Sequence, residues 1–265
     1  FRQVLLYGAL EWTPPAFAHL PLVVNGRRQK FSKRDGAQWL GDYRAQGYVP
    51  EAMLNFLVFL GWAPGDEREI FSLDELVAEF TLERVNRADA VFDPQRLDYF
   101  NGVWIRGFGL EELVERVLPY AALGGLDVDS GDREFFTAAL ALEQERLTHL
   151  NKISDLMEFF FDDSLDPDMR QAKFTKHSAE DTANALDRVI ECVRGVDVFE
   201  DAVLEAALRE LADELGWKAG DVFMPIRIGV TGRRASPPLF ETMGVLGRTR
   251  CCTRLRRAVA NLRQL

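Results

Sequence analysis

Hydrophobic residues recur every three or four positions through most of the second half of the chain, the spacing of one helix face. After about Leu110 this pattern predicts almost nothing but helices. The segments with helical spacing are Leu110–Ala122, Arg133–Leu150, Ile153–Phe161, Ala179–Val193, Phe199–Leu215 and Lys218–Ile228. A short helix is expected after Pro237-Pro238 and a last one over Thr249–Leu265. We therefore expect this half to be all-helical.

The start of the chain combines a helical segment with a hairpin signal. Residues 2–11 resemble the tail of a helix, which Pro14-Pro15 would end. The apolar stretch Leu20–Val24 leads into Asn25-Gly26, a dipeptide typical of tight hairpins. The second arm of the hairpin is expected to run from Arg28 to Phe31.

Helices are also expected between the hairpin and the second half. Gln38–Trp62 has helical spacing, and Pro50 suits a first helical turn. Ser72 is followed by two carboxylates within three residues, which predicts a capped helix start. A stop at Phe92-Asp93-Pro94 precedes a short helix that reaches Asn101-Gly102. The fold class predicted for the whole chain is mostly α.

Length and composition limit the number of domains and the class of protein. The chain has 265 residues, of which 47% are hydrophobic and 28% charged, enough for two or three units with separate cores. The longest apolar run, Leu54–Leu60, is too short to span a bilayer, so no membrane association is expected. Because the chain opens with Phe1 rather than Met, we interpret it as a fragment, a processed product or an incomplete chain.

Cysteine and histidine usage points to a reduced compartment without a structural metal. The three cysteines offer no even disulfide framework, which favours the cytoplasm. The three histidines do not stand at metal-ligand spacing with a cysteine, so no zinc site is expected.

Charge is unevenly distributed along the chain. The net charge of −10 argues against a general nucleic-acid coat, because phosphate binding depends on Lys and Arg. Basic residues nevertheless gather in two short stretches: Arg27, Arg28, Lys30, Lys33 and Arg34, and then Arg248, Arg250, Arg254, Arg256 and Arg257. Charge alone leaves two interpretations open, a specific RNA-binding site and a set of solvated surface faces. For the second stretch we favour a solvated face, with phosphate contact as the alternative.

The string Lys30–Ala37 is the most informative motif in the sequence. It places two cations and a hydroxyl on a glycine-containing loop after a hairpin. Such a loop can neutralise the charge that develops on a departing polyphosphate. A solvated basic turn is the alternative interpretation.

This loop and its surroundings resemble the glutamyl-tRNA synthetases, in which it is the second class I motif, written KMSKS in general. An ordered series of strings carries the resemblance from one end of the chain to the other. The strings are Phe17–Val24, Lys30–Ala37, Gly47–Ala52, Asn55–Leu57, Leu60–Trp62, Phe92-Asp93, Leu97, Asn101-Gly102, Met224–Ile228, Thr231-Gly232 and Ser236–Glu241.

The resemblance implies ATP-dependent attachment of glutamate to tRNA(Glu), with Mg as the counter-ion of ATP. Lys33 matches the lysine that contacts ATP, and Lys30 and Ser32 would support the loop. Phe31 departs from the usual Leu or Met, which adds bulk at the apolar anchor of the loop. No string before Lys30 resembles the H-I-G-H motif of the nucleotide-binding fold, so we expect the chain alone to be inactive.

The same resemblance implies four parts and a set of RNA contacts. Residues 1–14 would end a catalytic-domain helix, and residues 15–109 would hold the loop and contact the tRNA stem. Residues 110–167 and 168–265 would form two helical subdomains of an anticodon-binding cage. The candidate RNA contacts are Arg146, Arg227 and Arg34. The sequence leaves Arg146 open to an alternative, a surface arginine paired with Gln or Glu one turn away, and leaves Arg227 open to capping helix carbonyls.

Rival functions remain. A glutaminyl-tRNA synthetase would end in β-barrels, which the helical second half disfavours, and a glutamyl-queuosine type enzyme has no anticodon-binding half. A non-catalytic RNA-binding or scaffold module is the alternative of another class. We expect a cytoplasmic monomer with tRNA(Glu) as partner, and glutamate and ATP as partners of the full-length enzyme.

Overall fold

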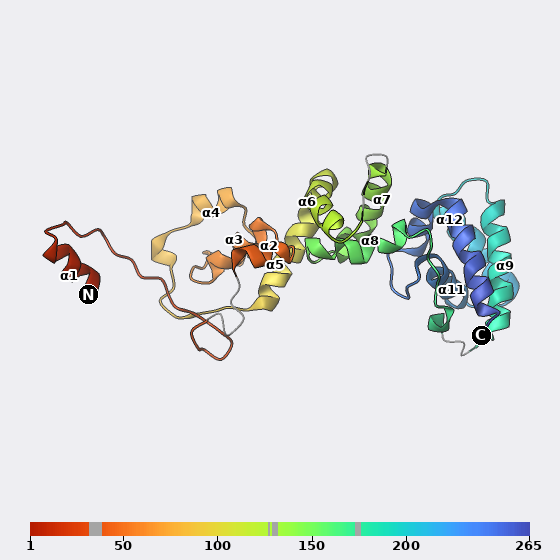
Figure 1. Ribbon diagram of the computed structural model, residues 1–265, viewed down its shortest axis with the longest axis horizontal. Coiled ribbons are helices and arrows are strands. Elements are labelled where there is room, and N and C mark those ends of the chain that lie inside the picture. Colours follow the sequence, from red (N-terminus) through yellow and green to blue (C-terminus); the bar gives the residue numbers. More distant parts are fainter. Residues whose placement is uncertain (32–38, 127, 129–131, 173–175) are drawn as a thin grey trace. The chain divides into compact units, whose positions relative to one another are not determined.

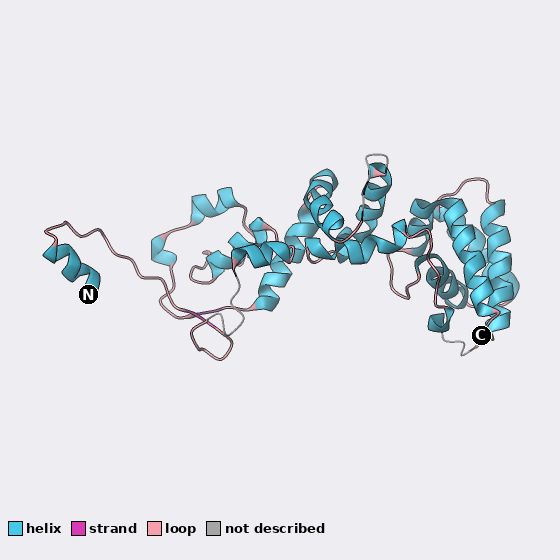
Figure 2. Ribbon diagram, viewed as in Figure 1, coloured by secondary structure: helices cyan, strands magenta, loops and turns pink. Residues whose placement is uncertain are grey.

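Helices are the main regular structure of the chain (Figures 1 and 2). The computed structural model describes residues 1–31, 39–126, 128, 132–172 and 176–265. These ranges divide into two compact units, one of residues 1–44 and 48–101 and one of residues 45–47 and 102–265. In the described ranges, no helix is long and apolar enough to cross a membrane. The mostly α fold class is confirmed.

The first unit combines short helices with one pair of very short strands. Its elements are α1 (Arg2–Ala9), β1 (Val23–Val24), α2 (Leu40–Ala45), α3 (Pro50–Phe59), α4 (Leu73–Glu79), the 3-10 helix η2 (Leu82–Arg84), β2 (Ala90–Val91) and the first part of α5 (Pro94–Gly107). β1 and β2 run parallel, with Val23 opposite Ala90 and Val24 opposite Val91. The sequence did not predict β2, because two residues are too few to show an alternating pattern.

The core of the first unit lies between α3 and α4. Trp62, Phe71 and Leu76 are buried together, with Phe59 packed against them. The fully buried Asn55 on α3 fastens the segment before α4, because its Oδ1 accepts from the Phe71 N–H at 2.8 Å and its Nδ2 donates to the Glu69 carbonyl at 2.6 Å. Both ends of the buried amide are therefore satisfied.

The helix start predicted at Ser72 is confirmed as a capping box. The Glu75 N–H donates to the Ser72 hydroxyl at 3.2 Å, and the Ser72 N–H donates to the Glu75 carboxylate at 2.8 Å. The two residues thus satisfy each other's backbone donors at the start of α4.

The single helix expected over Gln38–Trp62 is wrong, since α2 ends at Ala45 and α3 begins at Pro50. Gly47 separates them with a φ of 87°, a conformation that glycine adopts without strain. Its carbonyl oxygen accepts from the Leu150 N–H at 3.0 Å, and a Cβ at this position would meet the backbone of residues 150 and 151.

The second unit is built from helices alone in the ranges that the structure describes. They are α6 (Leu110–Leu123), α7 (Arg133–Glu143), α8 (Ile153–Phe161), α9 (Ala179–Gly195), α10 (Asp201–Leu215), α11 (Ala219–Thr231) and α12 (Leu239–Leu262), with the 3-10 helices η3 (Gln144–Arg146), η4 (Leu150–Lys152) and η5 (Met169–Ala172). α12 packs against α9, α10 and α11 (Figure 1). Gly247 interrupts α12 with a φ of 78°, which agrees with the two separate helices that the sequence predicted.

The helix expected over Arg133–Leu150 is too long, because α7 ends at Glu143. The chain tightens there into η3. The side-chain amide of Gln144 donates to the carbonyl oxygens of Ile105 and Phe108 at 3.2 and 2.9 Å. These contacts satisfy carbonyls at the end of α5, where a helix leaves its last acceptors without partners.

Candidate nucleic-acid interface

The first predicted site is the loop that follows β1. Lys30 is exposed, and its backbone forms an antiparallel bridge with Val24. The Phe31 N–H donates to the Val23 carbonyl oxygen at 3.0 Å. The other residues predicted in this loop lie outside the described ranges: Ser32, Lys33 and Arg34. Their roles therefore stay predictions.

The hairpin predicted at Asn25-Gly26 is confirmed, although its turn is longer than two residues. The Asn25 Oδ1 accepts from the Arg27 N–H at 2.9 Å and from the Gln29 N–H at 3.0 Å. Arg28, with a φ of 59°, adopts the left-handed conformation. An asparagine side chain that imitates a backbone acceptor holds the turn, so a glycine with positive φ is not needed.

Aromatic packing anchors the entry to the loop. The Phe31 ring stacks on the Phe92 ring with 4.5 Å between centroids and 13° between planes. Phe92 also meets the edge of Phe56 at 4.9 Å. Phe92 directly follows β2, so the short parallel strand pair brings the two rings together. The bulk that Phe31 adds is taken up in this stack.

The second predicted site is at Arg146, which pairs with a buried carboxylate. Glu143 is fully buried, and both of its carboxylate oxygens accept from the Arg146 Nη1, at 3.1 and 2.9 Å. The Arg146 side chain is 35% exposed. Burial raises the pKa of Glu143 to about 7, and the positive charges of Arg146 and Arg233 oppose that rise. The pairing with Glu one turn away, which the sequence left as an alternative, is thus present.

Arg227 on α11 lies near Arg146. Its Nη1 donates to the Pro237 carbonyl at 2.6 Å and to both the carbonyl and the hydroxyl of Ser236. Burial and then the positive charge of Arg146 lower the pKa of Arg227. Its hydrogen-bond partners in the described part of the chain are neutral, so no described carboxylate pairs with Arg227.

Three arginines therefore lie near one another, and two of them, Arg146 and Arg233, act on the Glu143 carboxylate. Arg146 comes from η3, Arg227 from α11 and Arg233 from the loop after α11, and all three act electrostatically on Glu143 or on one another. Arg233 lies over the Phe159 ring at 5.3 Å. We call Glu143, Arg146, Arg227 and Arg233 the arginine cluster. Arg233 also pairs with Glu158 at 3.4 Å, so the three arginines and the two carboxylates together have a formal charge of +1, in a chain whose net charge is −10.

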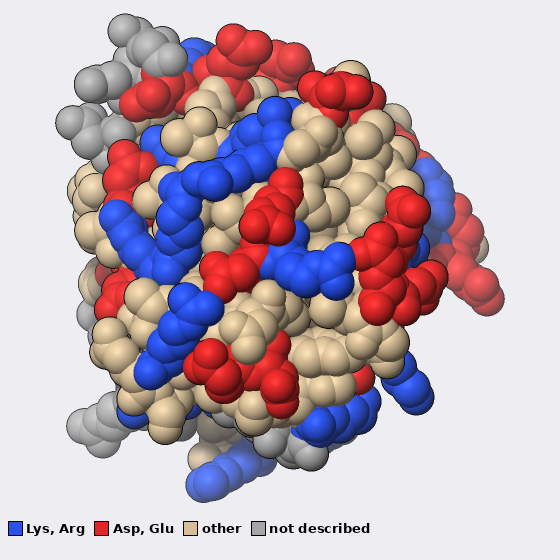
Figure 3. All heavy atoms as spheres, turned by 90° about the vertical axis from the view of Figure 1, so that its right-hand side faces the viewer, with Lys and Arg blue, Asp and Glu red and all other residues tan. Residues whose placement is uncertain are grey.

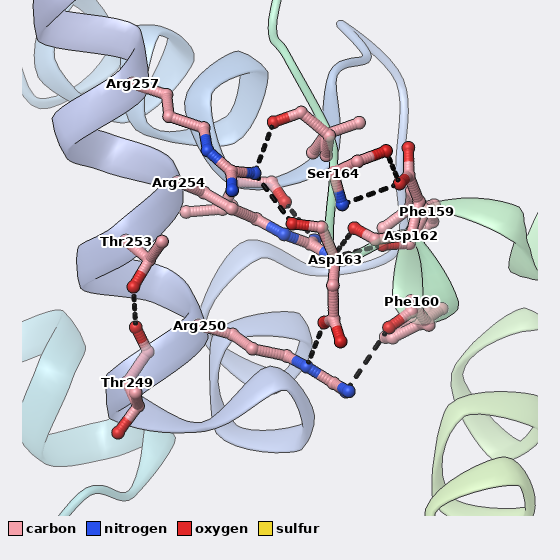
Figure 4. A network of polar contacts seen from close by, with 12 residues as sticks. Phe159, Phe160, Asp162, Asp163, Ser164, Thr249, Arg250, Thr253, Arg254 and Arg257 are labelled. Carbon is pink, nitrogen blue, oxygen red and sulfur yellow. Dashed lines mark hydrogen bonds and ion pairs between the residues drawn. The ribbon is translucent and has the colours of Figure 1, made fainter.

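The second basic stretch of the sequence has a different role, which Figure 4 shows. Arg254 is buried and donates to the carbonyl oxygens of Phe159, Asp162 and Val230 at 2.7, 2.9 and 2.6 Å. Its interpretation as part of a solvated face is wrong. Carbonyl acceptors fix the guanidinium fork inside the protein, where it joins α12 to the end of α8.

Neighbouring arginines of α12 extend this connection. Arg250 Nε donates to Asp163 Oδ1 at 2.9 Å, and Arg257 Nη1 donates to the Asp163 and Leu165 carbonyls at 2.7 and 3.1 Å. All three arginines point toward the segment that follows α8 (Figure 4). These arginines stabilise the fold and leave the arginine cluster as the candidate interface of the second unit.

Sequence reasoning missed Glu143, although a signal was present. Phe136, Leu140, Glu143 and Leu147 follow one another at intervals of four, three and four, and all are buried. A carboxylate in an apolar stripe marks a buried charge, which needs a partner. Ser236 carried no comparable signal, because its contact with Arg227 depends on a loop conformation.

Charge on the end of the second unit is mixed. Figure 3 shows Lys and Arg interspersed with Asp and Glu on the face seen there, without one dominant sign. This face thus has the charge pattern of an ordinary solvated surface.

Among the described residues, no group of three or more His, Cys, Asp or Glu is arranged to hold a metal ion.

Comparison with known proteins relates both units to tRNA ligases. Residues 1–99 match the family model of the catalytic domain of class I tRNA synthetases (E and Q), and residues 112–259 match that of an anticodon-binding domain. A glutamate–tRNA ligase of Dehalococcoides mccartyi is 37% identical over 271 residues, covering 100% of this chain and 55% of that protein. One from Acidothermus cellulolyticus is 40% identical, covering 98% of this chain and 52% of that protein.

A solved structure gives the same relationship. The glutamate tRNA ligase of Elizabethkingia meningosepticum, crystallised with its amino acid, superposes with a TM-score of 0.84 at 28% identity. The match covers 98% of this chain and 54% of that one. The chain thus spans about half the length of the relatives it matches. It belongs to the glutamyl-tRNA synthetases, the glutamate–tRNA ligase family of class I, and carries their anticodon-binding domain.

Proposed function

We propose that the protein to which this chain belongs attaches glutamate to tRNA(Glu) with ATP, and that this chain supplies the tRNA-binding part and the lysine loop. Glutamate and ATP would give glutamyl-adenylate and pyrophosphate, and the glutamyl group would then pass to the terminal adenosine of the tRNA. Membership of the family supports the reaction. The observation that supports tRNA binding is that two predicted RNA contacts, Arg146 and Arg227, lie in one partly exposed cluster.

The chemistry of the arginine cluster suits an RNA base. Its three guanidinium groups can attract the phosphate backbone, and a guanidinium fork can bond a base edge at two points. Residues 15–109, which include the proposed RNA contact Arg34, would bind the tRNA stem. The helices from residue 110 onward would bind the anticodon. The boundaries at residues 14, 109 and 167 belong to this proposal.

The roles at the lysine loop are proposed on the resemblance alone. Lys33 would contact ATP and stabilise the charge on the departing phosphates, with Lys30 and Ser32 supporting the loop. Mg would accompany ATP as its counter-ion. The hairpin and the Phe31–Phe92 stack support a defined entry to the loop.

Three further proposals concern the chain as a molecule. The string H-I-G-H does not occur in the 265 residues, so we expect this chain alone not to form glutamyl-adenylate. We expect a monomer. A cytoplasmic location follows from the proposed reaction, because its tRNA substrate is used there.

The test is binding of the 265-residue chain to tRNA(Glu), measured by fluorescence anisotropy at fixed ionic strength, beside tRNAs with other anticodons. Arg146→Gln should weaken binding of tRNA(Glu) by about 1–3 kcal/mol and reduce the preference for its anticodon. Arg188→Gln is the control, since Arg188 is an exposed arginine paired with Glu214. Equal affinity for every tRNA would favour the scaffold alternative, and absence of binding would contradict the proposal.

A further inference from the structure

The contact between Glu143 and Arg146 uses only one nitrogen of the guanidinium. Both oxygens of Glu143 accept from Nη1. Within the described residues, Nε and Nη2 of Arg146 have no hydrogen-bond partner. These two nitrogens form one edge of the planar fork and donate in parallel, which is the geometry of bidentate recognition. The carboxylate therefore occupies one side of the fork and leaves the bidentate edge available.

The carboxylate is itself held in place. Glu143 is fully buried at the end of α7, so packing fixes its rotamer, while Arg146 on η3 is partly exposed. An exposed arginine without a partner samples many rotamers, and ordering it costs free energy on binding. A fixed acceptor at Nη1 removes part of that cost before RNA arrives.

Retention of this carboxylate is unfavourable for the fold. Burial of Glu143 disfavours its ionised form, which is the form that holds Arg146. Apolar residues precede and follow it in the same buried stripe, so a methionine or leucine would suit the packing. Packing alone therefore does not account for this charge, and its side-chain partner among the described residues is Arg146.

We propose that Glu143 is a positioning residue for RNA recognition: it binds Nη1 of Arg146 and so presents the Nε and Nη2 edge to a base with two adjacent acceptors. Cytosine (O2 and N3) and guanine (O6 and N7) offer such a pair, whereas the N3–H of uracil separates its two carbonyl oxygens and the N6 amino group of adenine separates N1 from N7. The proposal rests on the proposed function only in that Arg146 contacts RNA. Glu143 itself does not touch the RNA.

The experiment is a double-mutant cycle with Glu143→Gln and Arg146→Gln in the 265-residue chain. The affinity for the tRNA(Glu) anticodon stem–loop is compared with the affinities for three loops, each with one anticodon base changed. Glu143→Gln keeps the shape of the side chain but removes its charge. We expect it to reduce discrimination by about five- to tenfold at one base, a cytosine or guanine, and to leave the other two positions unaffected. Glu214→Gln removes the carboxylate of an exposed pair on α10 and is the matched control.

The cycle separates the positioning role from a structural one. If Glu143 acts through Arg146, the double variant discriminates no worse than Arg146→Gln alone. Additive losses, or a loss spread evenly over all three bases, would overturn the inference. If Arg146→Gln lowers discrimination and Glu143→Gln does not, this inference fails while the proposed function stands. If the wild-type chain binds none of the loops, both fail.

Discussion

The guanidinium of Arg254 donates its Nη2 to the carbonyl oxygen of Phe159 across 2.7 Å, linking residues 95 positions apart. The same side chain reaches Asp162 and Val230, so one buried fork satisfies acceptors at the end of α8 and on α11. Its hydrogen-bond partners among the described residues are all backbone carbonyls, which a side-chain substitution does not remove. Substitution of Arg254 therefore removes all three contacts at once.

Arg254→Ala should destabilise the second unit by about 3–5 kcal/mol, because three carbonyl oxygens lose a buried, charged donor. Denaturant unfolding followed by circular dichroism measures this change. Arg256→Ala is the control, since Arg256 is exposed on the same helix, and it should change stability by less than about 0.5 kcal/mol. Similar effects from the two variants would contradict the structural role of Arg254.

Glu143→Gln should change the pH dependence of stability. The pKa of Glu143 rises from an ordinary value of 4.5 to about 7 in the folded protein because the group is buried. Between these values the folded state binds more protons than the unfolded state, so the wild type loses stability as pH rises from 4.5 to 7. The variant lacks this contribution. Its free energy of unfolding relative to that of the wild type should therefore increase as pH rises over that interval, as measured by unfolding at pH 5, 6, 7 and 8. A difference that is independent of pH would show that Glu143 ionises normally.

Gly47→Ala should destabilise the protein more than Gly216→Ala. Both glycines have positive φ, at 87° and 69°, so both substitutions carry backbone strain of about 1 kcal/mol. Only at Gly47 would the new methyl group meet backbone atoms, those of Leu150 and Asn151, while Gly216 has open space. Thermal unfolding should show the larger decrease in Tm for Gly47→Ala. Equal decreases in Tm would mean that the backbone around residue 150 shifts at little cost in free energy.

Lys33→Ala in the full-length enzyme should slow formation of glutamyl-adenylate while leaving the affinity for tRNA nearly unchanged. The reason is that Lys33 is proposed to stabilise charge on pyrophosphate as it leaves, a charge that tRNA binding does not develop. Pyrophosphate exchange measures the first quantity and anisotropy the second. Equal losses in both would contradict the assignment of Lys33 to ATP.

Much of the helical fold could be predicted from sequence, since the period of apolar residues reports one buried helix face directly. Ile153–Phe161 was predicted with the bounds that α8 has. The helix ends were predicted wrongly where tertiary contacts interrupt a helix although the helical spacing of apolar residues continues. Gly47 breaks an apparent helix because backbone from residue 150 lies against it, and Gln144 ends α7 through bonds to the end of α5. Neither contact is visible in a local pattern.

The candidate site was predictable only in part. Arg146 and Arg227 were identified through the resemblance, but their proximity depends on how η3 and α11 pack. Arg254 was misjudged because an arginine on an amphipathic helix ordinarily faces solvent. Its acceptors are carbonyls, and every residue carries one, so no sequence pattern indicates which carbonyls need a side-chain donor.

The 95-residue separation between Arg254 and Phe159 has a consequence for biosynthesis. A ribosome adds about 5–20 residues per second, so α12 emerges roughly 5 to 20 s after the α8 residues whose carbonyls it will bind, 95 positions earlier. During that interval these carbonyls are hydrated. The nascent chain therefore completes this unit only after translation has passed α12, and messages with premature stop codons before Arg254 would yield products open to proteolysis.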